Sequence, residues 1–102
     1  MAHEDLHEPF SELSKKTKNM HRAIISLVEE LEAVDWYNQR ADICEDSELQ
    51  AILIHNRDEE KEHAAMLIEW IRRNDKAFDD ELHDYLYTEK SIAGLEKEQK
   101  SD

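Results

Sequence analysis

The chain has 102 residues, of which 38% are charged, a net charge of -13, and a single glycine and a single proline. This length allows one domain (1–102), the composition favours long helices over sheets, and the acidic charge argues against nucleic acid and anionic membranes while attracting cations. No stretch approaches the roughly 18 apolar residues of a membrane helix, and no signal peptide precedes Pro9. The lone Cys44 cannot form an intrachain disulfide, which favours a reducing interior.

A first helix is predicted over about residues 9–43. Pro9 suits the first turn of a helix, and nothing breaks the helical pattern before Ile43. Glu30 interrupts an apolar stripe on one face of this helix. The stripe and the seam beside it consist of Met20, Ala23, Ile24, Leu27, Leu31, Val34 and Tyr37.

A second helix is predicted over residues 47–74, because Ser47 and Gln50 form a capping-box pattern after the interruption "CEDSELQ". Its stripe is apolar at both ends and polar in the middle, where it reads Asn56, Glu60 and His63. The apolar members are Leu49, Leu53, Leu67 and Trp70. The short connection between the two helices predicts an antiparallel hairpin. A short third helix is predicted over 76–87, followed by a flexible tail over 88–102.

Two helices cannot bury both of their apolar stripes on each other. Ile25, Val28 and Ile52 lie beyond the seams that a two-helix contact needs. Self-association solves this problem, because two hairpins can form a four-helix bundle. We therefore expect an all-α fold: an antiparallel two-helix hairpin with a short C-terminal helix, dimerising into a ferritin-like four-helix bundle.

The polar interruptions point to a metal. Three residues of a helix turn about 300°, so Glu60 and His63 project to neighbouring points on one face. A buried carboxylate needs a partner, and carboxylate oxygen with imidazole nitrogen binds divalent iron, manganese or zinc. Di-iron bundles take a lone Glu from each of two helices and a Glu-x-x-His pair from each of the others. This chain holds one of each, Glu30 and Glu60-x-x-His63, and so encodes half of a di-metal site.

Other interpretations of these residues stay open. A Glu-x-x-His pair arises by chance in many charged helices, and the stretch can be a solvated face. We assign Glu59, Lys61 and Glu62 to such a face. Tyr37, on the same stripe as Glu30, is either a hydrogen-bond donor to a ligand or a core tyrosine.

The stretches "HRAIISLVEELEAVDWYNQR" and "HNRDEEKEHAAM" resemble the signature stretches of encapsulated ferritins, and the resemblance covers about residues 6–86. It implies a helical hairpin that pairs into a bundle with iron at the interface. Dimers would then assemble into an open ring, usually a homodecamer. It also implies an encapsulin shell partner and a place in the bacterial cytoplasm, within an encapsulin nanocompartment. The ferroxidase ligands of the family fall on Glu30, Glu60 and His63, with Tyr37 beside them.

The resemblance further implies an entry site formed by Glu29 and Glu32, with Trp36 beside it, where calcium or another divalent ion can bind. From spacing alone these residues indicate a solvated acidic face with one aromatic side chain. The stretch "SIAGLEKEQKSD" does not clearly show the peptide by which many members dock on the shell. Encapsulation is therefore expected on the resemblance alone.

The sequence thus predicts a ferroxidase that oxidises Fe(II) at a di-iron centre. One alternative is a rubrerythrin-like di-iron peroxidase, although a single cysteine cannot build the rubredoxin-type centre that usually accompanies it. The other is a non-enzymatic acidic helical interaction module, in which Glu60 and His63 merely pair with each other. A spectral change on anaerobic ferrous loading followed by air separates the ferroxidase from that module.

Overall fold

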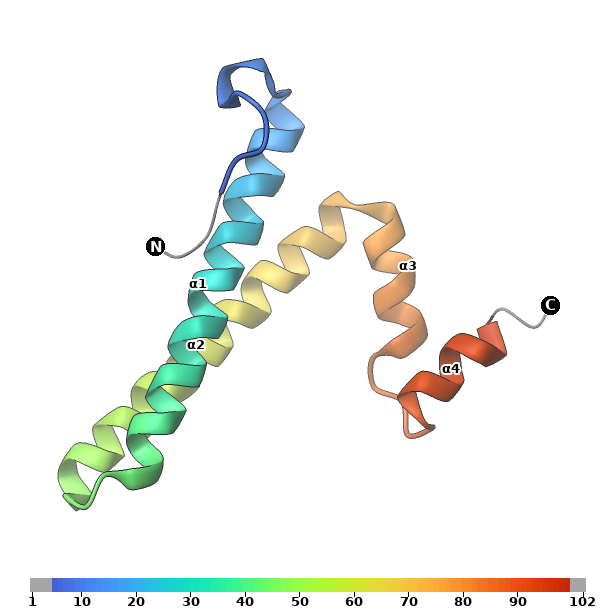
Figure 1. Cartoon of the computed structure of the whole chain (residues 1–102). Coiled ribbons are helices and arrows are strands. Elements are labelled where there is room, and N and C mark those ends of the chain that lie inside the picture. Colours follow the sequence, from blue (N-terminus) through green and yellow to red (C-terminus); the bar gives the residue numbers. More distant parts are fainter. Residues whose placement is uncertain (1–4, 100–102) are drawn as a thin grey trace.

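The computed structural model describes residues 5–99, which are helical apart from short connections (Figure 1). The elements are a 3-10 turn, η1 (Phe10–Glu12), and the helices α1 (Lys15–Ile43), α2 (Ser47–Asn74), α3 (Lys76–Tyr85) and α4 (Ile92–Gln99). This confirms the predicted all-α fold class. Within the described range, no helix combines the length and the apolar character needed to cross a membrane.

The first helix begins later than predicted. Residues Phe10–Glu12 form a separate turn in which the Glu12 amide donates to the Pro9 carbonyl over 3.0 Å. Ser14 then takes an extended conformation, and its hydroxyl oxygen accepts a hydrogen bond from the Thr17 amide over 3.2 Å. The start near Pro9 is therefore wrong, because the Ser14 side chain caps α1 and fixes its first residue at Lys15.

The second helix begins at Ser47 as predicted, but with a different cap. The carboxylate of Asp46 accepts the Leu49 amide over 2.9 Å, so Asp46 is the N-cap. Gln50 does not complete a capping box. Its side-chain amide donates to the Ala41 carbonyl over 2.8 Å and so joins the end of α1 to the start of α2.

Helices α1 and α2 form the predicted antiparallel hairpin (Figure 1). Arg57 of α2 donates to the side-chain oxygen of Asn38 on α1 over 3.1 Å. Small side chains let the two backbones approach closely. The buried residues of the hairpin are Ala23, Ala41, Ala64 and Ile71.

The C-terminal part differs from the prediction in two places. Helix α3 ends at Tyr85, two residues before the expected end, and Tyr87 has a positive φ of 58° in the turn that follows. The segment predicted as a flexible tail contains helix α4, in which Leu95 is buried and Glu98 accepts a 3.0 Å ion pair from Lys90. Residues 100–102 of that predicted tail lie outside the described range.

A single chain exposes more surface than a compact monomer of its size. Its accessible surface is 8214 Å², against about 6000 Å² for a compact monomer of 12.1 kDa. Its radius of gyration is 17.6 Å, against about 13 Å for a globular chain of 102 residues. The hairpin alone therefore lacks a conventional core. Large apolar side chains exposed on it include Ile24, Leu31, Leu49, Ile52, Met66 and Trp70.

Candidate metal centre

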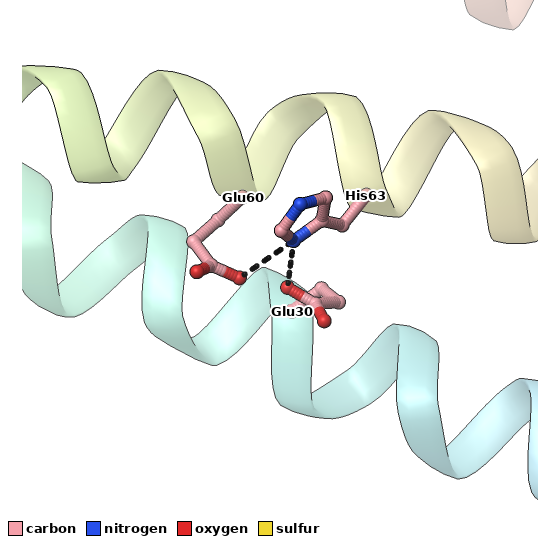
Figure 2. A group of neighbouring side chains, drawn as sticks. All are labelled: Glu30, Glu60 and His63. Carbon is pink, nitrogen blue, oxygen red and sulfur yellow. Dashed lines mark ion pairs between the residues drawn. The ribbon is translucent and has the colours of Figure 1, made fainter.

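The three residues singled out by the polar interruptions meet between α1 and α2. Glu30 lies near the middle of α1, and Glu60 and His63 lie near the middle of α2. Nδ1 of His63 is 3.5 Å from Oε2 of Glu30 and 3.5 Å from Oε2 of Glu60. Figure 2 shows both carboxylates pointing toward this one imidazole nitrogen, each from its own helix.

One buried carboxylate oxygen in this group lacks a hydrogen-bond donor among the described residues. Oε2 of Glu30 is buried and accepts no hydrogen bond from any residue that the structure describes. Its 3.5 Å approach to His63 is longer than a hydrogen bond of normal strength. A buried carboxylate oxygen without a donor is unfavourable, and a cation bound beside it removes the penalty.

The donor set suits a transition metal. Ligand atoms of Glu30, Glu60 and His63 all lie within 4.8 Å of one another, so one ion can contact all three. Two carboxylate oxygens and one imidazole nitrogen favour iron, manganese or zinc over the softer metals that select sulfur. The side chain of His63 is 41% exposed, against 25% for Glu30 and 24% for Glu60. The group is therefore open on one side, where further ligands can approach.

A second group shares the same imidazole. Ligand atoms of Glu59, Glu62 and His63 also lie within 4.8 Å of one another, but both glutamates are exposed. Glu59 in addition forms a 3.2 Å pair with His55 one turn earlier. The sequence interpretation placed Glu59 and Glu62 on a solvated face and did not foresee this grouping, although the spacing Glu-x-x-Glu-His contains it.

The other predicted site residues do not join this centre within one chain. Glu29 is exposed, Glu32 is half-buried, and Trp36 is 51% exposed. Tyr37 lies under the guanidinium of Arg40, 5.3 Å from its ring centroid. In the described part of the chain, its hydroxyl makes no hydrogen bond to Glu30, Glu60 or His63.

Known proteins resemble this chain over most of its length. The EncFtn-like family model matches residues 5–89. The "Encapsulated ferritin-like protein" of Rhodospirillum rubrum is 60% identical over 90 residues, which cover 88% of this chain and 64% of that protein. The "Ferritin-like protein" of Thermotoga maritima is 53% identical over 92 residues, which cover 90% of this chain and 81% of that protein. The chain thus spans less than two thirds of the Rhodospirillum relative.

A solved structure shares the fold. The crystal structure of a protein from Nitrosomonas europaea superposes with a TM-score of 0.86 at 70% identity, covering 88% of this chain and 99% of that one. The helical hairpin, the Glu and His group at its centre and the family match over residues 5–89 agree with one another. The chain therefore belongs to the EncFtn-like family, the encapsulated ferritins.

Proposed function

We propose that this protein is a ferroxidase, which oxidises Fe(II) to Fe(III) at a di-iron centre formed across a homodimer interface. The observation that carries the proposal is the group of Glu30, Glu60 and His63, in which a buried carboxylate oxygen has no donor. In this reaction iron is the substrate. A cation of this kind is the partner that the oxygen lacks.

The dimer follows from the incomplete ligand set. One chain offers three ligand side chains, and the imidazole among them is 41% exposed. A two-fold axis beside this group brings a second set of three to the same place, which is the ligand number of a di-iron carboxylate bundle. The surface in excess of a compact monomer supports the same arrangement, because pairing covers the exposed apolar side chains.

The carboxylates and His63 have separate roles in the proposed oxidation. Carboxylates stabilise Fe(III) more than Fe(II), because the interaction grows with the charge of the ion, and they thus favour loss of an electron. His63 fixes the position of the ion, and the small ligand set leaves coordination positions open for an oxidant. Two Fe(II) ions give up one electron each. The pair reduces dioxygen to hydrogen peroxide, or hydrogen peroxide to water, with the uptake of two protons.

We further propose that Glu29 and Glu32 form half of an entry site. Both lie on α1 within one turn of Glu30, so a dimer places two copies of each near its axis. Four carboxylates gathered there offer oxygen ligands only, which suit calcium as well as Fe(II). In this proposal Trp36 is the aromatic side chain beside the entry, and Tyr37 is the aromatic side chain beside the metal centre of the dimer.

The proposed assembly extends beyond the dimer. We expect dimers to join into a ring-shaped homodecamer that works inside an encapsulin shell in the bacterial cytoplasm and delivers ferric iron for mineralisation there. The name of the Rhodospirillum relative, "Encapsulated ferritin-like protein", supports an encapsulin partner.

Substitution of the three ligands tests the proposal. Glu30→Gln, Glu60→Gln and His63→Ala should each slow iron oxidation by more than about 100-fold, because loss of even an outer-shell partner costs 10- to 100-fold. The rate is followed as ferric absorbance after anaerobic loading with Fe(II) and exposure to air. Far-UV circular dichroism checks that the helices persist.

Two neighbouring residues supply matched controls. Glu59→Gln and Glu62→Gln remove the same charge from the exposed group around His63 and should leave the oxidation rate within about twofold, as expected for solvated side chains. Wild-type rates in the three ligand variants would reject the site. A wild-type protein that shows no spectral change on ferrous loading followed by air would favour the non-enzymatic interaction module. Two irons per dimer, measured together with the native mass, would support the site.

A further inference from the structure

Asn56 is the third polar residue in the apolar stripe of α2, and the proposed reaction gives it no role. It lies one turn before Glu60 and two turns before His63 on the same face of the helix. The stripe is apolar on either side of these three residues, at Leu53 and Leu67. An amide in such a stripe is unfavourable unless it is hydrogen-bonded, so its presence calls for a partner.

The described chain holds no such partner for Asn56. Its side chain is half-buried and forms no hydrogen bond with another residue between positions 5 and 99. Other asparagines of the hairpin are paired: Asn38 accepts from Arg57 over 3.1 Å, and Asn19 accepts from Arg22 over 2.8 Å. Asn56 therefore keeps an unused amide on the face of α2 that carries the candidate metal ligands.

Glu60 offers a carboxylate within reach of this amide. Side chains of a helix lean toward its N-terminus, so the Glu60 side chain extends over the turn that holds Asn56. Figure 2 shows one oxygen of Glu60 directed at His63 and the other directed away from it, toward the earlier residues of α2. Helical residues four apart have Cβ atoms about 5–6 Å apart, which allows an amide and a carboxylate to form a hydrogen bond by side-chain rotation alone.

A neutral donor suits this position better than a charged side chain does. A lysine or arginine would also donate to Glu60, but its charge would repel a cation at the centre. The NH2 group of Asn56 donates without adding charge. A carboxylate oxygen has more than one lone pair, so Glu60 can accept from Asn56 while it binds an ion. Hydrogen bonds of this kind hold a ligating carboxylate in one orientation.

We propose that Asn56 is a positioning residue of the metal centre. In the iron-bound protein its side-chain amide donates to the Glu60 carboxylate and fixes the orientation in which that carboxylate binds the ion. The inference rests on the proposed function and adds to it a residue that acts through Glu60 and does not itself contact iron.

Three substitutions at this position test the donor. Asn56→Leu removes the amide, Asn56→Asp keeps its shape but replaces the donor with an acceptor, and Asn56→Gln keeps the donor on a longer side chain. The first two should slow iron oxidation and weaken Fe(II) binding by about 10- to 100-fold, the cost of losing a residue that orients a ligand. Asn56→Gln should stay within about threefold of the wild type. Stopped-flow oxidation and anaerobic Fe(II) titration measure the two effects.

Stability should change in the opposite direction to activity. Asn56→Leu completes the apolar stripe and removes an unpaired amide, so it should raise the melting temperature by about 2–6 °C. Asn38→Leu is the matched control, because it removes an amide whose hydrogen bond to Arg57 joins α1 to α2. It should lower the melting temperature and leave the oxidation rate within about twofold of the wild type. Thermal circular dichroism gives both melting temperatures.

Cobalt(II) provides a signal that does not depend on turnover. It binds to nitrogen and oxygen ligands as Fe(II) does, and its d–d absorption bands report the coordination geometry. At saturating cobalt, Asn56→Leu should shift these bands, whereas Asn56→Gln and Asn38→Leu should reproduce the wild-type spectrum. Native mass spectrometry should show the same oligomers in all variants.

Wild-type oxidation and an unchanged cobalt spectrum in Asn56→Leu would overturn the inference. Full activity in Asn56→Asp would also overturn it, because an oxygen at this position would then suffice. A slower oxidation that follows from a weaker dimer in the mass spectra would do the same. These three outcomes leave the proposed ligands in place. Wild-type rates in the variants of Glu30, Glu60 and His63 would instead reject the proposed centre itself, and this inference with it.

Discussion

Glu30 is the residue on which the proposed chemistry depends most directly. Its Oε2 is buried without a hydrogen bond, while the facing Nδ1 of His63 lies equally far from Glu60. A structural ion pair would shorten one of these contacts at the expense of the other. Three ligand side chains held around one point, none in a strong contact with another, fit the proposed binding of an ion.

Glu29 and Glu32 allow a prediction at the same scale. The double variant Glu29→Ala/Glu32→Ala should change the initial rate of iron oxidation at least about severalfold, in either direction, because a site that holds ions both concentrates and delays them. Zinc should inhibit the wild type more than the variant. Stopped-flow oxidation with and without zinc measures both effects. A variant that matches the wild type in rate and in zinc sensitivity would show that Glu29 and Glu32 are only part of a solvated acidic face.

The grouping of Glu30, Glu60 and His63 was predictable, because a polar side chain inside an apolar stripe is unfavourable and stands out in the sequence. Glu30, Glu60 and His63 each interrupt such a stripe, and the structure brings the three together. Glu59 and Glu62 interrupt nothing, since they lie on an exposed face. Their grouping around His63 therefore had no counterpart in the hydrophobic pattern.

The junction between α2 and α3 is the element that sets the shape of the C-terminal part. Asp75 ends α2 and caps α3 by accepting the Phe78 amide over 3.0 Å. Arg72 then spans the junction, donating to Glu69 on α2 over 2.7 Å and to Asp79 on α3 over 2.6 Å. The guanidinium groups of Arg72 and Arg73 lower the pKa of Glu69 to about 2.

Arg72 should hold α3 in its position, and Arg73 supplies the control. Arg73 donates to Glu69 within α2 and does not reach α3. Arg72→Ala should therefore raise amide hydrogen exchange in α3 by about two- to fivefold, as loss of a partly exposed ion pair predicts. Arg73→Ala should leave exchange in α3 unchanged. Equal exchange in both variants would show that the bridge to Asp79 does not restrain α3.

The ion pair between Arg72 and Asp79 should persist to mildly acidic pH. Arg72 also lowers the pKa of Asp79. Carboxylates with a lowered pKa in the folded state contribute stability above their ordinary pKa, and this contribution is lost as the pH falls toward the folded value. Protection of α3 should accordingly stay constant from pH 8 to about 5 and decline below about 4.5. Amide hydrogen exchange in α3, measured across this pH range, checks this dependence.

The helix boundaries show how far sequence patterns reach at this scale. The start of α2 and the end of α1 were predictable, because turn residues mark them. The start of α1 was not, since Pro9 and Ser14 both suit a helix start and only the Ser14 side chain makes the capping bond. The angle at the α2–α3 junction depends on contacts of Arg72 that no periodicity reports.

At the scale of the whole molecule, the single chain leaves large apolar side chains exposed. Its surface of 8214 Å² exceeds that of a compact monomer by about a third. The apolar stripes predicted this excess of exposed surface, because each stripe is wider than the contact between two helices. The candidate metal centre lies in the same exposed hairpin, so a dimer that covers this surface would also complete the proposed ligand set.

Metal binding should therefore strengthen the dimer. Ligands from two chains bind an ion only in the dimer, so free ion at 100 times its dissociation constant adds about 2.7 kcal/mol per site, roughly 100-fold in the dimer dissociation constant. Without metal, four carboxylates and two imidazoles crowd one interface, and the repulsion among the carboxylates opposes association. Sedimentation of dilute protein in anaerobic Fe(II) and in chelator measures the difference. His63→Ala should abolish it, whereas Lys61→Ala, which alters an exposed side chain 3.3 Å from Asp58, should preserve it. An oligomer distribution that chelator leaves unchanged at low concentration would mean that apolar packing alone holds the chains together.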